Sequence, residues 1–132
     1  MGYIKNMNKI CTDINQSQKL IELGIDVKTA DMFWDTLFAK KPEAQVNNHH
    51  YIDEYDDEHR VPAWSLSALL ELMPKIHEYE TDAGCQPILC KGWDNFQWHV
   101  VYRSSIHITE WYDDPLDAAF EMIIWLKENG KI

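Results

Sequence analysis

Apolar residues recur at helical spacing along the C-terminal segment, residues 114–132. Asp114 is a favourable N-cap, because its carboxylate can accept hydrogen bonds from the unpaired N–H groups of a first turn. Pro115 fits the first helical position, and Gly130 suits the left-handed residue that ends many helices. The pattern predicts a long C-terminal helix with two apolar faces. One stripe contains Leu116, Ala119, Phe120, Ile123 and Leu126, and the roughly opposite side contains Ala118, Met122 and Trp125.

A shorter central helix is predicted within the apolar run from Val61 to Pro74. Ser65 is a favourable N-cap for it. Pro74 ends the helix, because its ring disfavours helical geometry at the preceding residue. The apolar residues between them follow the i, i+3, i+4 and i+7 spacing of one helix face: Leu66, Leu69, Leu70 and Met73.

Between residues 86 and 112 the apolar spacing changes from helical to alternating, which indicates strands. The alternating residues are Ile88 and Cys90, then Phe96, Trp98, Val100 and Tyr102, then Ile106 and Ile108. The apolar residues of 96–102 and of 106–108 lie on one face only if the loop between them is residues 103–105. A shift of one residue would place the side chains of the last strand on the opposite face. The sequence therefore predicts a three-stranded antiparallel meander. It also places His99 and His107 together on the face opposite the apolar stripe.

The rest of the chain is less regular. Residues 1–15 are polar and are expected to be loosely ordered, while residues 17–23 and 27–31 read as short helices. Residues 32–38 fit either a helix face or a fourth strand, and we lean towards extended structure. Residues 40–60 are polar and charged, and we expect a long acidic surface loop. The fold class predicted is α+β, with residues 16–132 as a single domain.

Composition narrows the choice of function. The chain has 132 residues, 45% of them hydrophobic, which is ample for one core. Its 22 acidic and 12 basic residues give a net charge of −10, which argues against direct binding to nucleic acids or anionic membranes. The sequence shows no secretory signal and no apolar run long enough to span a bilayer. Three cysteines without a close pair fit reduced thiols, so we expect a cytoplasmic protein.

Two groups of residues are candidates for chemistry. The run from His49 to His59 is rich in histidine and carboxylates, but its spacing matches no known metal motif, and a solvated acidic loop explains it. His99 and His107, near Arg103 and Trp111, are able to bind an anion or act as acid and base. Such residues also form an ordinary polar sheet face. From the sequence we therefore assign no catalytic, metal-binding or cofactor-binding residue, and we expect no cofactor.

The tryptophans suggest contact with a partner. Five tryptophans are too many to bury fully in one small core, so at least one is expected at a contact surface: Trp64, Trp93, Trp98, Trp111 and Trp125. The second apolar side of the C-terminal helix also lacks an assigned neighbour. The predicted interaction surface therefore consists of Ala118, Met122, Trp125 and Trp111. The expected partner is a protein, which includes a second copy of this chain in a homodimer.

Four stretches carry a resemblance: LIELGIDVKTADM, VPAWSLSALLELMPKI, the tryptophan-rich strands and DPLDAAFEMIIWLKENGKI. Together they resemble small uncharacterised proteins carried by phages and mobile elements of gut bacteria. The likeness covers most of the chain except residues 1–15 and 40–60. It implies a cytoplasmic accessory protein and carries over no activity, ligand or catalytic residue.

Three hypotheses follow. The first is a non-enzymatic interaction module that associates with itself through the second apolar helix face. The second is an acidic protein that imitates nucleic acid and inhibits a nucleic-acid-binding protein, using the carboxylates of residues 53–58 and 110–121. The third is a metal-dependent enzyme that uses the loop from His49 to His59.

Overall fold

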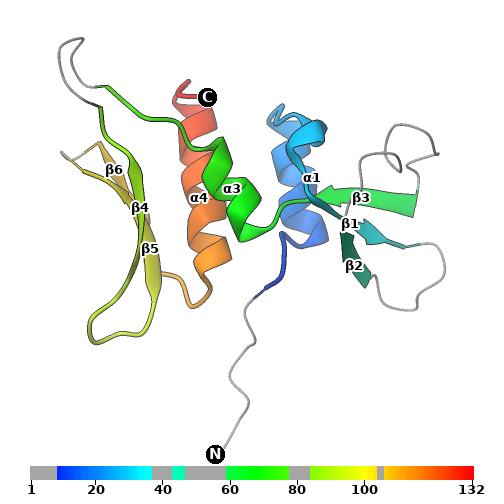
Figure 1. Cartoon of the computed structure of the whole chain (residues 1–132), viewed down its shortest axis with the longest axis horizontal. Coiled ribbons are helices and arrows are strands. Elements are labelled where there is room, and N and C mark those ends of the chain that lie inside the picture. Colours follow the sequence, from blue (N-terminus) through cyan, green and yellow to red (C-terminus); the bar gives the residue numbers. More distant parts are fainter. Residues whose placement is uncertain (1–8, 37–42, 47–58, 78–83, 104–105) are drawn as a thin grey trace, which may run out of the picture.

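The computed structural model describes residues 9–36, 43–46, 59–77, 84–103 and 106–132. Within these residues the chain is α+β, as predicted, with three α-helices and two three-stranded antiparallel sheets (Figure 1). In chain order the elements are α1 (Ile14–Glu22), the 3-10 helix η1 (Val27–Thr29), β1 (Met32–Asp35), β2 (Glu43–Val46), β3 (Arg60–Ala63), α3 (Leu66–Leu72), β4 (Pro87–Lys91), β5 (Trp98–Tyr102), β6 (His107–Ile108) and α4 (Pro115–Glu128).

The first sheet has the strand order β2-β1-β3. Residues 32–35 therefore form the strand left open by the sequence, but it belongs to this separate sheet and not to the meander. The expected loop at 40–60 contributes β2, and the beginning of the apolar run assigned to the central helix contributes β3. Pro62 is tolerated there because β3 is an edge strand, where a missing N–H leaves no ladder bond unmade.

The segment before α1 is packed, contrary to the expectation that residues 1–15 are loosely ordered. The Thr12 N–H donates to the Trp64 carbonyl at 2.9 Å, and the Trp34 indole N–H donates to the Thr12 carbonyl at 2.7 Å. Cys11 and Thr12 are buried. These hydrogen bonds and the burial of Cys11 and Thr12 hold residues 9–15 in place, so the expectation is wrong for them. Residues 1–8 lie outside the described part.

The helices begin and end with the caps read from the sequence. The Ser65 hydroxyl accepts from the Ala68 N–H at 3.2 Å, and the Asp114 carboxylate accepts from the Leu116 N–H at 2.9 Å. Gly130 has a φ of +67°, the left-handed conformation expected after α4. None of the helices in the described ranges has both the length and the apolar character needed to cross a membrane.

The second sheet is the predicted meander, with the order β4-β5-β6, but its last register differs from the expectation. Tyr102 pairs with His107, so residues 103–106 lie between the paired positions and not the predicted 103–105. Because side chains alternate along a strand, this shift turns β6 over. His107 therefore shares the inner face with Tyr102, and Ile108 points outward and is 53% exposed. His99 stays on the outer face, so the two histidines are on opposite sides.

Helix α4 lies between the second sheet and the other helices (Figure 1). The Trp125 ring stacks on His107 of β6, so the side of α4 that carries Ala118, Met122 and Trp125 faces the sheet. Ala118 and Met122 are fully buried, and the first apolar stripe is buried as well. The prediction that Ala118 and Met122 form an uncovered contact face is therefore wrong, because the sheet and the helices cover both sides of α4.

Candidate functional site

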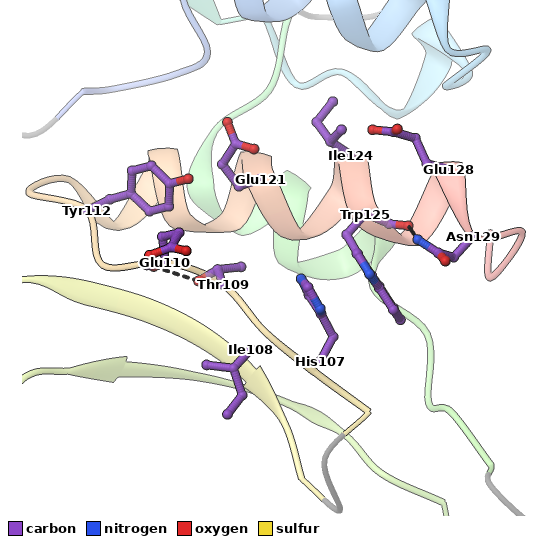
Figure 2. A pocket seen from close by; sticks show the side chains of 10 residues that line it. All are labelled: His107, Ile108, Thr109, Glu110, Tyr112, Glu121, Ile124, Trp125, Glu128 and Asn129. Carbon is purple, nitrogen blue, oxygen red and sulfur yellow. Dashed lines mark hydrogen bonds between the residues drawn. The ribbon is translucent and has the colours of Figure 1, made fainter.

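A groove lies between the solvent edge of α4 and the chain segment that leads from β6 to α4 (Figure 2). It has a volume of about 280 Å³. Three glutamates, two aromatic rings and one imidazole are among its lining residues, and we call it the acidic groove. The full lining is His107, Ile108, Thr109, Glu110, Tyr112, Glu121, Ile124, Trp125, Glu128 and Asn129.

The helix wall of the groove follows from the sequence pattern of α4. Glu121 and Glu128 are seven residues apart, so they lie on one edge of the helix, two turns from each other. Figure 2 shows both projecting from α4, with Ile124 between them. The remaining sides of the helix are occupied by core residues. The acidic edge therefore contributes two carboxylates to the groove, and Ile124 and Trp125 of the same helix contribute its apolar part.

The opposite wall is held by hydrogen bonds to β5. The Thr109 N–H donates to the Val100 carbonyl, and the Val100 N–H donates to the Thr109 hydroxyl, both at 2.9 Å. Tyr112 exchanges two main-chain bonds with Trp98, at 2.7 and 2.8 Å. Glu110 lies between these two anchors. Its backbone is therefore fixed relative to the sheet, and the groove does not depend on an unsupported loop.

Within the described residues, none of the three groove carboxylates forms an ion pair. Among the described residues, the ion pairs recorded are those of Lys9 with Asp13 and Asp117. Burial raises the pKa of Glu121, and the neighbouring charges of Asp117 and Glu128 raise it further. A raised carboxyl pKa means that the charged form is disfavoured where it stands. The groove therefore carries negative charge that no described basic side chain offsets through an ion pair.

Aromatic side chains contribute the other part of the lining. The rings of His107 and Trp125 stack with centroids 4.2 Å apart and an angle of 6°. Burial lowers the pKa of His107, so this imidazole is mostly neutral at pH 7. Burial raises the pKa of the Tyr112 hydroxyl, and the charges of Glu121 and Glu110 raise it further, so it stays protonated. None of these rings supplies positive charge to the groove.

This combination is suited to a cationic group. Carboxylates form strong charge-assisted hydrogen bonds with ammonium and guanidinium groups, and aromatic faces attract the same cations. A metal ion fits less well, because the described part of the chain holds no group of three histidine, cysteine or acidic side chains able to bind one. The loop from His49 to His59, apart from His59, lies outside the described residues, and the metal site there stays a prediction.

The residues predicted as an interaction surface do not come together. Ala118 and Met122 are in the core, and Trp125 lines the acidic groove. Trp111 is 40% exposed on the far side of the second sheet, where it stacks on His99 with centroids 3.9 Å apart. Trp64 is fully buried, whereas Trp93 is 97% exposed. The exposure of Trp93 agrees with the expectation that one small core does not bury every tryptophan.

The groove and its three glutamates were not among the sites predicted from the sequence. The seven-residue spacing of Glu121 and Glu128 is visible in the sequence. Glu110 reaches the same place only because the chain after β6 is tied to β5. Comparisons of the chain with models of protein families, with curated proteins and with solved structures find no match.

Proposed function

We propose that this chain is a non-enzymatic, cytoplasmic binding module whose acidic groove takes a lysine or arginine side chain of a basic protein partner. The observation that carries the proposal is the set of three glutamates that line one groove, none of which forms an ion pair with another described residue. A charged group that pays a desolvation cost without a partner in the same chain is typical of a binding site.

Energetic estimates support a specific but moderate interaction. Each hydrogen bond between a charged donor and a carboxylate contributes about 1.5–3 kcal/mol. A cation against a half-exposed aromatic ring adds about 0.5–1 kcal/mol. Glu110 and Glu128 are exposed and Glu121 is only half-buried, so water screens part of this attraction. We therefore expect the groove to anchor one side chain of a longer basic segment.

The net charge of the chain supports the same partner. A charge of −10 attracts a basic protein over a longer range than any single contact. Such attraction accelerates association but carries little specificity by itself. The groove then supplies what overall charge does not, namely a defined place for one cationic group.

Binding of a fluorescent lysine- and arginine-rich peptide, measured by anisotropy at low salt, tests the proposal. A triple variant, Glu110→Gln with Glu121→Gln and Glu128→Gln, should weaken binding by about tenfold or more, because charge-assisted bonds are lost. The matched control, Glu22→Gln with Glu71→Gln and Asp26→Asn, removes the same charge at exposed positions outside the groove, and Asn is itself a good N-cap at position 26. An equal loss of affinity in both variants would show that only net charge matters, and the groove would then have no role.

An acidic imitation of nucleic acid is the second candidate function, and the same carboxylates favour it. Glu110 and Glu121, from one of the two stretches expected to carry it, lie at one groove. The other stretch, residues 53–58, lies outside the described residues. Competition distinguishes the two functions: duplex DNA should displace the chain from a nucleic-acid-binding partner under this hypothesis. A partner that binds this chain and DNA at the same time argues for the peptide groove instead.

A further inference from the structure

The second sheet has a face turned away from α4, and five of the six residues assigned to it below are apolar. Directly paired residues of neighbouring strands point to the same side of a sheet. Ile88 pairs with Val101, and Val101 pairs with Ile108, which makes one row across all three strands. Cys90 pairs with His99, and Trp111 stacks on His99, which makes a second row. We call these six residues the outer face.

The outer face is separate from the core and partly open to solvent. The aliphatic and aromatic residues of the inner face, among them Leu89 and Trp98, pack against the main core, whereas those of the outer face do not. Ile108 is 53% exposed and Trp111 is 40% exposed. A contiguous apolar patch of this kind costs free energy in water and marks a contact surface.

The charge distribution indicates what covers this face. None of the six outer-face residues is acidic, although the chain as a whole has a charge of −10. Two such chains repel each other over most orientations, and they approach at the lowest electrostatic cost where carboxylates are absent. A second copy of the chain therefore fits this face without bringing acidic groups against each other.

The ends of β5 add charge complementarity. Arg103 follows β5 at one end and is exposed, and Asp94 lies at the other end in the connection from β4. Neither is recorded in an ion pair with another described residue. A two-fold axis perpendicular to the strands makes the two sheets antiparallel across the contact. Arg103 of each chain then lies near the end of the partner sheet that carries Asp94. Because the axis is two-fold, this contact occurs twice.

We propose that two copies of this chain pair face to face through the outer face, sheet against sheet, with their β5 strands antiparallel. Packed sheets of this kind interdigitate their side chains at a spacing of about 10 Å. Ile108 also lines the acidic groove, so the proposed contact reaches one rim of that groove. The three carboxylates of the groove come from α4 and from the segment after β6, and none of them belongs to the outer face.

Light scattering coupled to size-exclusion chromatography, over low to high micromolar concentrations, tests the pairing. The wild-type chain should be a dimer, and Ile108→Glu should raise the dimer dissociation constant by about tenfold or more, because it buries a charge in the contact. Ile108 is half exposed, so this change leaves the core intact, which circular dichroism checks. Ile10→Glu is the matched control: Ile10 is 70% exposed and lies beside the first sheet, so the dimer should persist.

Charge exchange tests the orientation. Arg103→Glu alone and Asp94→Arg alone should each weaken the dimer, because like charges then meet. Combining them restores opposite charges and should recover the wild-type dissociation constant to within a few fold. A strictly monomeric wild-type chain overturns the proposal, and so does a dimer that Ile108→Glu leaves unchanged. Failure of the double variant to recover the dimer overturns the antiparallel arrangement.

Discussion

The two histidines of the second sheet have similar contacts but lie on opposite faces of the sheet. Each stacks on a tryptophan, His99 on Trp111 and His107 on Trp125. His107 lies between the sheet and α4, whereas His99 belongs to the outer face. The same pair of residue types therefore covers a core edge in one case and contributes to a proposed contact in the other.

His107 gives a prediction of pH dependence. Burial lowers its pKa from the ordinary value of 6.5 in the folded chain. The unfolded chain then takes up a proton at a higher pH than the folded chain does, so stability is complete above about pH 6.5 and falls as the pH drops below it. We expect the melting temperature to fall between about pH 6.5 and pH 5.5, and to fall less in His107→Gln.

Glu121 changes the pH dependence of stability in the opposite direction to His107, and substitutions separate the two effects. Its pKa is raised above 4.5, so the folded chain takes up this proton first and stability rises as the pH falls towards that value. Glu121→Gln should therefore flatten the acid end of the profile and leave the drop due to His107. Identical slopes for the wild type and His107→Gln would contradict the assignment to His107.

At the scale of elements, α4 is the best-predicted part of the chain. Its start at Asp114, its end before Gly130 and its two apolar sides follow from local sequence. The neighbour that covers each side does not follow from local sequence, because helical periodicity shows which residues share a face but not what packs against it. The sheet covers the side of Ala118, Met122 and Trp125, which we had expected to remain open.

A core substitution checks this arrangement. Met122 is fully buried, so Met122→Ala should cost about 2–5 kcal/mol of unfolding free energy, measured by urea denaturation. Ile124→Ala, on the half-exposed edge of the same helix, is the control and should cost less. A Met122→Ala chain with unchanged stability but altered association would support the original contact surface instead.

The hairpin between β5 and β6 is where sequence reasoning failed by one residue. Alternation favoured a three-residue loop, because it kept both isoleucines of residues 106–108 on the inner face. The observed pairing of Tyr102 with His107 turns Ile108 outward. In this register His107 stacks on Trp125, and that contact offsets the free-energy cost of exposing Ile108. The contact forms only when α4 is in place. Local alternation contains no information about that helix.

At the scale of the whole molecule, net charge acts in opposite directions on the two proposed contacts. Salt screens the attraction between an acidic groove and a basic peptide, so peptide affinity should fall as ionic strength rises. Salt screens the exposed Arg103–Asp94 pairs of the dimer, but it also screens the repulsion between two chains of charge −10, so a dimer held by its apolar face should persist. Anisotropy and light scattering across one salt series measure both. A dimer that dissociates together with the peptide complex would contradict the apolar outer face.

The sequence by itself determined the α+β class, the helix caps, the three strands of the meander and the acidic balance, because these depend on residues close together in the chain or on simple counts. Only the tertiary structure decided the separate first sheet, the register of β6 and the burial of both sides of α4. It also brought Glu110 beside Glu121 and exposed the outer face. Each of these depends on contacts between distant segments, whose packing free energy no local pattern specifies.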